Sequence, residues 1–76
     1  MSKNEHEVWN DIQGELTGSD VREVYEGNVK DILLDAVRTI QEADSFAAQS
    51  DPQMTYARLT EAAAMLVHAM ELCDTE

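Results

Sequence analysis

The sequence predicts an all-α protein, formed by an antiparallel two-helix hairpin with a short N-terminal helix and completed as a helical-bundle homodimer. Apolar residues recur at alternating spacings of three and four, the period of one helix face, and no stretch shows the two-residue period of a strand. Ser50-Asp51-Pro52 separates the two longest patterns. Because 76 residues with 5% aromatics bury only a thin core, we expect one domain over 1–76 that gains stability by dimerising.

The clearest element is a helix over 52–74. Asp51 is suited to cap it, and Pro52 fits the first helical position, where its missing N–H costs nothing. The apolar positions form two adjacent stripes. These are Tyr56, Leu59, Ala63, Leu66, Met70 and Cys73 in the first, and Ala62, Met65, Ala69 and Leu72 in the second. Together they exceed the usual apolar third of a surface helix, so we expect one side to face the rest of the chain. The face with Met65, Ala69 and Leu72 would contact a second copy or a partner.

A second helical pattern covers 19–49. Asn28 can cap a helix that begins beside it, with Asp31 in a capping-box position, but the pattern also continues upstream. We therefore predict one helix over 19–49, bent near Gly27, where an internal glycine costs about 1 kcal/mol.

A short turn joins this helix to the helix over 52–74, which makes the pair an antiparallel hairpin. Alanines on both facing stripes allow the backbones to approach closely. We expect Leu33, Ile40, Leu66 and Met70 to interdigitate between the two helices.

The first element is a short helix over 5–13, capped by Asn4 and ended by Gly14. Val8, Trp9, Ile12 and Leu16 have helical spacing but form a narrow apolar edge. We expect this helix to lie across the hairpin with Trp9 as its anchor. Acidic residues, Glu7 and Asp11, lie on both sides of Trp9 in the sequence.

The charge is the strongest functional signal. Sixteen acidic residues against five basic ones give a net charge of −11, beyond the −2 to −8 or so that solubility asks of a small domain. Because self-repulsion opposes folding, the excess favours a role in binding a basic protein surface. The simpler alternative is a solvated acidic surface. The candidate contact residues are Glu7, Asp11, Glu15, Asp20, Glu23, Glu26, Asp31, Asp35 and Glu42, together with Trp9.

Other chemistry is not indicated by the sequence. No glycine-rich phosphate loop or positioned nucleophile is present, so we expect no enzyme and no cofactor. His6 and His68 lack the Glu-x-x-His spacing of a bundle metal site, and we expect no metal. The few cations argue against direct binding to nucleic acid or anionic membranes. Cys73 is expected to be a small buried hydrophobe. The N-terminus lacks a signal-peptide core, which indicates a cytoplasmic protein.

The predicted function is therefore a non-catalytic inhibitor that occupies a basic, nucleic-acid-binding surface of another protein. In size, acidity and lack of motifs the chain resembles small phage-encoded blockers, including anti-CRISPR proteins and other DNA mimics, although no specific motif carries this resemblance. Two alternatives stay open. One is a helical adaptor or assembly factor that binds through the apolar face of its last helix. The other is an antitoxin or immunity protein that neutralises a basic toxin.

Overall fold

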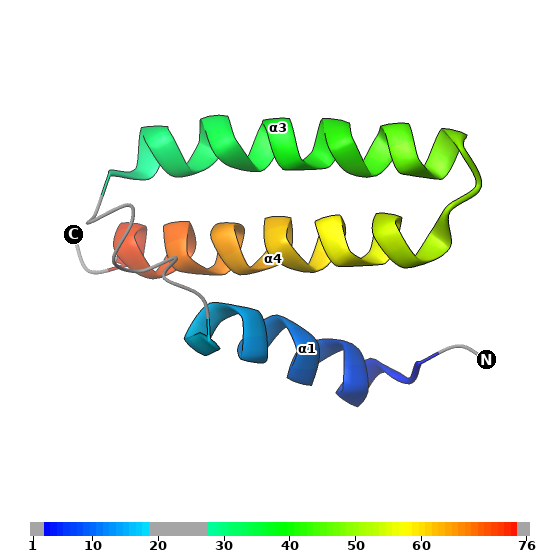
Figure 1. Cartoon of the computed structure of the whole chain (residues 1–76). Coiled ribbons are helices and arrows are strands. Elements are labelled where there is room, and N and C mark those ends of the chain that lie inside the picture. The colour runs from blue at the N-terminus through cyan, green and yellow to red at the C-terminus, as the bar shows by residue number, and fades with distance from the viewer. Residues whose placement is uncertain (1–2, 19–27, 75–76) are drawn as a thin grey trace.

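The computed structural model describes residues 3–18 and 28–74, and in these ranges the only regular elements are helices (Figure 1). They are α1 (Glu5–Gly18), α3 (Val29–Ala48) and α4 (Pro52–Asp74). Helices α3 and α4 form the predicted antiparallel hairpin, and α1 packs on the other side of α4. Helix α4 is therefore the central element, with a neighbour on each side.

The turn between α3 and α4 satisfies the backbone groups of both helix ends. Ser50 has a φ of 58°, and its N–H and that of Asp51 bond to the carbonyls of Ala47 and Phe46, which is a Schellman arrangement with serine in place of glycine. Asp51 then accepts a hydrogen bond from the N–H of Met54 at 3.1 Å, and Pro52 begins α4. The prediction of a break, a cap and a helix over 52–74 is confirmed.

The start of α3 differs from the prediction. Asn28 has an extended backbone, with φ −91° and ψ 91°, and its side chain accepts a hydrogen bond from the N–H of Asp31 at 3.3 Å. It is a genuine N-cap, so a single helix through this point is wrong. The local capping bond outweighs the continuity of the apolar pattern. The rest of the predicted segment, 19–27, lies outside the described residues.

Helix α1 is longer than predicted. Asn4 caps it through a 2.9 Å bond from the N–H of Glu7, as expected, but the helix continues through Gly14 to Gly18. Leu16 explains the extension, because it is buried against Ala64 of α4 and holds the final turn in place. Tertiary packing thus overcomes the cost of an internal glycine.

The contact between α3 and α4, here named the seam, is made largely by small residues. Its buried side chains are Ile32, Ala36, Thr39 and Ala43 from α3, and Ala62 and Ala69 from α4. Ile32, at 0% exposure, is the one large side chain that is fully buried among the described residues. The predicted interdigitation of Leu33, Ile40, Leu66 and Met70 is wrong. Alanines bring the helices so close that these larger residues remain outside, 39–70% exposed.

Candidate functional site

Acidic side chains form a stripe along one flank of α3. Asp31, Asp35 and Glu42 follow one another at spacings of four and seven, which places them on the same side of the helix. Adjacent members of such a stripe stand about 5–6 Å apart at Cβ when they are one turn apart. The stripe lies on the opposite flank of the seam from Leu33, Val37 and Ile40.

Arg58 joins the α3 stripe to α4. Its Nη1 donates to Glu61 at 2.7 Å, and its Nε lies 3.5 Å from a carboxylate oxygen of Glu42. The hydrogen bond and charge of Glu61 raise the pKa of Arg58 above its usual value, with a smaller contribution from Glu42. The guanidinium therefore holds two carboxylates from different helices side by side.

A shallow groove between α1 and α4 is also lined by carboxylates. It has a volume of about 480 Å³, and its lining includes Asp11 and Glu15 from α1 together with Glu61 from α4. We name the combined surface of Asp11, Glu15, Asp31, Asp35, Glu42 and Glu61 the acidic face. All three described helices contribute to it.

Asp11 is held by two partners. It accepts a hydrogen bond from the hydroxyl of Tyr56 at 2.5 Å and pairs with the ammonium group of Lys3. Lys3 and Tyr56 lower the pKa of Asp11, in that order of strength. The Lys3 nitrogen also lies 4.7 Å from the centre of the Tyr56 ring. This cluster attaches the N-terminal helix to α4.

The remaining candidates of the acidic set are placed differently. Glu7 is exposed on α1, one turn before Asp11, and does not line the groove. Trp9 is also exposed, at 53%, so it is a weaker anchor than predicted. Asp20, Glu23 and Glu26 lie outside the described residues. Of the twelve carboxylates in the described ranges, six, Glu7 included, are not part of the acidic face. They are Glu5, Glu7, Asp44, Asp51, Glu71 and Asp74.

The predicted apolar partner face is mostly covered by the chain itself. Ala69 is 5% exposed in the seam, and Met65 and Leu72 are half-buried. The exposed apolar surface is instead on the other flank of the hairpin and on the outer side of α3, where Leu34 lies. We name it the apolar face, and its members are Leu33, Leu34, Val37, Ile40, Leu59, Leu66 and Met70.

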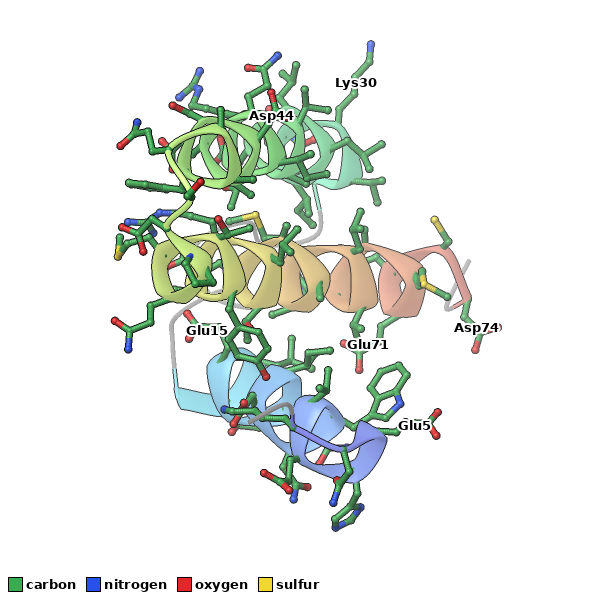
Figure 2. The ribbon with its side chains drawn as sticks, turned by 90° about the vertical axis from the view of Figure 1, so that its right-hand side faces the viewer. Glu5, Glu15, Lys30, Asp44, Glu71 and Asp74 are labelled. Carbon is green, nitrogen blue, oxygen red and sulfur yellow. The ribbon has the colours of Figure 1, made fainter. Side chains whose placement is uncertain are left out.

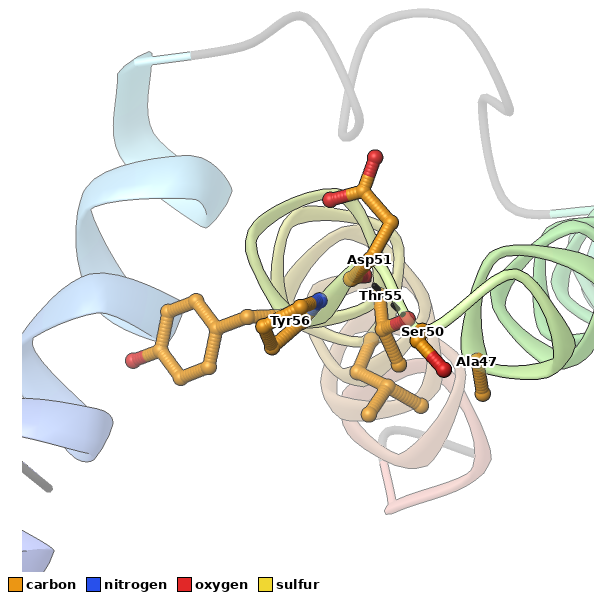
Figure 3. Close-up of a pocket in the computed structure, with 7 residues that line it drawn as sticks. Ala47, Ser50, Asp51, Thr55 and Tyr56 are labelled. Atoms are coloured by element: carbon orange, nitrogen blue, oxygen red, sulfur yellow. Dashed lines mark hydrogen bonds between the residues drawn. The ribbon is translucent and has the colours of Figure 1, made fainter.

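Two hollows mark the apolar face. One, of about 650 Å³, lies between the beginning of α3 and the end of α4, lined by Leu33, Leu66 and Met70 among others. The other, of about 480 Å³, lies near the turn beside Leu59 and Tyr56 (Figure 3). Cys73 borders the first hollow and is exposed, so the prediction that it is buried is wrong. The three-and-four spacing identifies these residues as apolar helix positions, but it does not determine which stripe faces the seam.

His68 is a buried polar residue of α4. It is 6% exposed, neither ring nitrogen forms a hydrogen bond, and a Glu71 carboxylate oxygen lies 3.5 Å from Nδ1. Within residues 3–18 and 28–74, no three histidine, cysteine or acidic side chains are placed to hold a metal ion. None of the described helices has the length and apolar content needed to cross a membrane.

Comparisons with known protein families, with curated protein sequences and with solved structures gave no match to this chain.

Proposed function

We propose that this protein is a non-catalytic acidic inhibitor that acts in the cytoplasm by occupying a basic, nucleic-acid-binding surface of another protein, as phage-type blockers and DNA mimics do. The acidic face carries the proposal, because Arg58 links Glu42 of α3 to Glu61 of α4, and Glu61 shares the α1–α4 groove with Asp11 and Glu15 of α1. Lys3 and Arg58 are paired with these carboxylates. A basic partner would relieve the repulsion among these carboxylates.

Arg58 and Lys3 support this function by fixing the geometry of the face. Each is engaged with carboxylates of the same face, so it orders acidic side chains more than it offers a separate positive site. Ordered charges lose less entropy on binding than freely rotating ones. The face therefore presents a defined anionic pattern, which is what a groove that binds a phosphate backbone recognises.

The test is capture followed by a salt titration. The tagged chain is incubated with lysate of its source organism or host at about 50 mM NaCl and eluted at about 500 mM, where exposed charges are screened beyond a few ångströms. The captured protein is then purified, and its affinity is measured with and without a competing DNA duplex. We expect binding to weaken steeply with salt and DNA to displace the inhibitor.

Two double variants with the same change in net charge locate the contact. Asp35→Lys with Glu42→Lys alters the acidic face, whereas Glu5→Lys with Asp74→Lys alters exposed acids outside it. We expect the first pair to weaken binding by about 100-fold or more and the second by about 3-fold or less. Equal losses, or a complex that survives about 1 M NaCl, would contradict the proposal.

The second candidate is the helical adaptor, and the exposed apolar face favours it. A monomer that leaves Leu33, Leu66 and Met70 in water has an apolar surface available for a partner. A complex that is insensitive to salt and is lost in Leu66→Lys would favour this function. An antitoxin or immunity protein would share the acidic-face chemistry, with a basic toxin as the target.

A further inference from the structure

The apolar face is at the upper limit of the apolar area that an ordinary monomer exposes. Seven side chains, each 39–70% exposed, leave on the order of 600 Å² of apolar area in water, the upper end for a typical monomer. A stable interface takes about 800 Å² from each partner. The seam itself buries one large side chain, Ile32, and several alanines, so the hairpin has little core of its own.

We infer that the α3 part of the apolar face is the interface of a two-fold homodimer in which α3 lies antiparallel to α3 of a second copy, with the symmetry axis beside Val37. Val37 stands at the middle of the exposed apolar stretch of α3 and is 54% exposed. In this pairing, Leu34 of one copy meets Ile40 of the other, because each is three residues from the axis. This inference is independent of the proposed inhibitor function.

The charges at the ends of α3 determine this arrangement. Lys30 and Asp44 are exposed on the outer side of α3, away from α4 (Figure 2), and neither forms an ion pair within the described ranges. Each is seven residues from Val37, in opposite directions. An antiparallel two-fold pairing therefore places Lys30 beside Asp44 of the second copy, twice per dimer. A parallel pairing would place Lys30 beside Lys30.

The net charge of the chain is compatible with this dimer. Asp31, Asp35 and Glu42 lie on the other flank of the seam, so the two acidic faces point outward, away from the interface. Long-range repulsion between two chains of charge −11 remains, and salt screens it. Dimerisation should therefore strengthen with added salt, whereas binding of a basic partner should weaken.

The first experiment is sedimentation equilibrium of the full chain from about 1 to about 200 µM, with Val37→Lys and the equally charged control Gln53→Lys on exposed α4. We expect a dimer for the natural chain and the control, and at least about 100-fold weaker association for Val37→Lys, with unchanged helicity by circular dichroism. A natural chain that stays monomeric at the highest concentration, or a Val37→Lys dimer of unchanged affinity, would overturn the inference.

A charge swap tests the register. Lys30→Asp and Asp44→Lys should each weaken the dimer by about 10-fold, and the double variant should recover most of that loss. Within one chain the two positions are about 21 Å apart along the helix, beyond the screening length of about 8 Å at physiological salt, so the recovery must arise between copies. Absence of recovery would overturn the antiparallel pairing.

A cross-link provides a check that does not depend on stability. In a Cys73→Ser background, Val37→Cys places two thiols at the symmetry axis, where mild oxidation should join them, while Gln53→Cys should not cross-link. Equal cross-linking of the two positions would also overturn the inference.

Discussion

The two flanks of α3 share one backbone and one seam but offer opposite chemistry. On one flank Asp31, Asp35 and Glu42 form an acidic stripe, and on the other Leu33 and Ile40 lie half-exposed beside the apolar residues of α4. Salt weakens contacts made by the first flank and leaves contacts made by the second largely intact. The net charge of the chain therefore describes only one of its two candidate surfaces.

Both flanks result from the narrow seam. Ala36 and Ala43 on α3 and Ala62 and Ala69 on α4 bring the two backbones close together. A close seam covers few positions on each helix, so acidic residues on one side and large apolar residues on the other stay outside it. The fold leaves these two surfaces exposed.

The largest expected effect separates the seam from the apolar face. Ile32→Ala should lower the free energy of unfolding by about 2–5 kcal/mol at every protein concentration, because it opens a cavity at a fully buried position. Val37→Ala lies five residues further along α3. It should lower the free energy of unfolding only at protein concentrations where the dimer forms. Chemical denaturation at about 1 and about 100 µM measures both.

Equal effects of the two variants would contradict this distinction between the seam and the apolar face. A loss for Val37→Ala as large as that for Ile32→Ala at the low concentration would mean that Val37 is covered within a single chain. The boundary between seam and apolar face would then have to be redrawn.

The elements could be predicted where local chemistry decides them. Asn4, Asn28 and Asp51 were identified as caps, and each accepts the expected backbone hydrogen bond. The end of α1 was missed because burial of Leu16 against Ala64 is a tertiary contact that no local pattern contains. Continuity across Asn28 was also predicted wrongly, since periodicity alone does not report a break in the backbone.

For the two surfaces, the sequence predicts which residue types are present but not how the fold arranges them. The acidic stripe of α3 follows from spacing, but the position of Arg58 between Glu42 and Glu61 depends on how the hairpin closes. The apolar stripes of α4 were found, yet the larger residues were expected to fill the seam. Which of two adjacent stripes is buried depends on the helix separation, and that is set by the alanines of both helices together.

A buried polar group lies on the acidic side of α4, and its replacement should have a smaller effect. His68 is seven residues after Glu61 and buries two ring nitrogens without hydrogen bonds. His68→Leu has similar volume and removes the cost of leaving these atoms unsatisfied, so it should raise stability by about 1 kcal/mol. For a domain of this size that is a rise in melting temperature of roughly 4–8 °C.

His6→Leu is the matched control, because His6 is exposed on α1. It should change the melting temperature little. A loss of stability in His68→Leu would show that the imidazole is bound by water or by a neighbour in solution, and the acidic side of α4 would then contain a polar network absent from the apolar face.

The smallest expected effect concerns the Asp11 cluster at the edge of the acidic face. The hydrogen bond to Asp11 raises the pKa of the Tyr56 hydroxyl, because the carboxylate favours the protonated phenol. Asp11→Asn removes that charge, so the pKa of Tyr56 should fall back toward its ordinary value of 10.0. The pKa of Tyr56 can be measured by ultraviolet absorbance during an alkaline titration. A Tyr25→Phe background leaves Tyr56 as the one tyrosine of the sequence that titrates.

The same contact has a signature at acid pH. The pKa of Asp11 is lowered in the folded chain, so its contribution to stability is present above the ordinary carboxyl pKa of 3.8 and is lost as the pH falls through the lowered value. The stability difference between the natural chain and Asp11→Asn should therefore disappear in acid. For the raised pKa of Tyr56 the sign is reversed, and the contribution is lost above pH 10.0. A variant that titrates like the natural chain at both ends would show that the Asp11 cluster does not hold α1, and the acidic face would then lose its fixed edge.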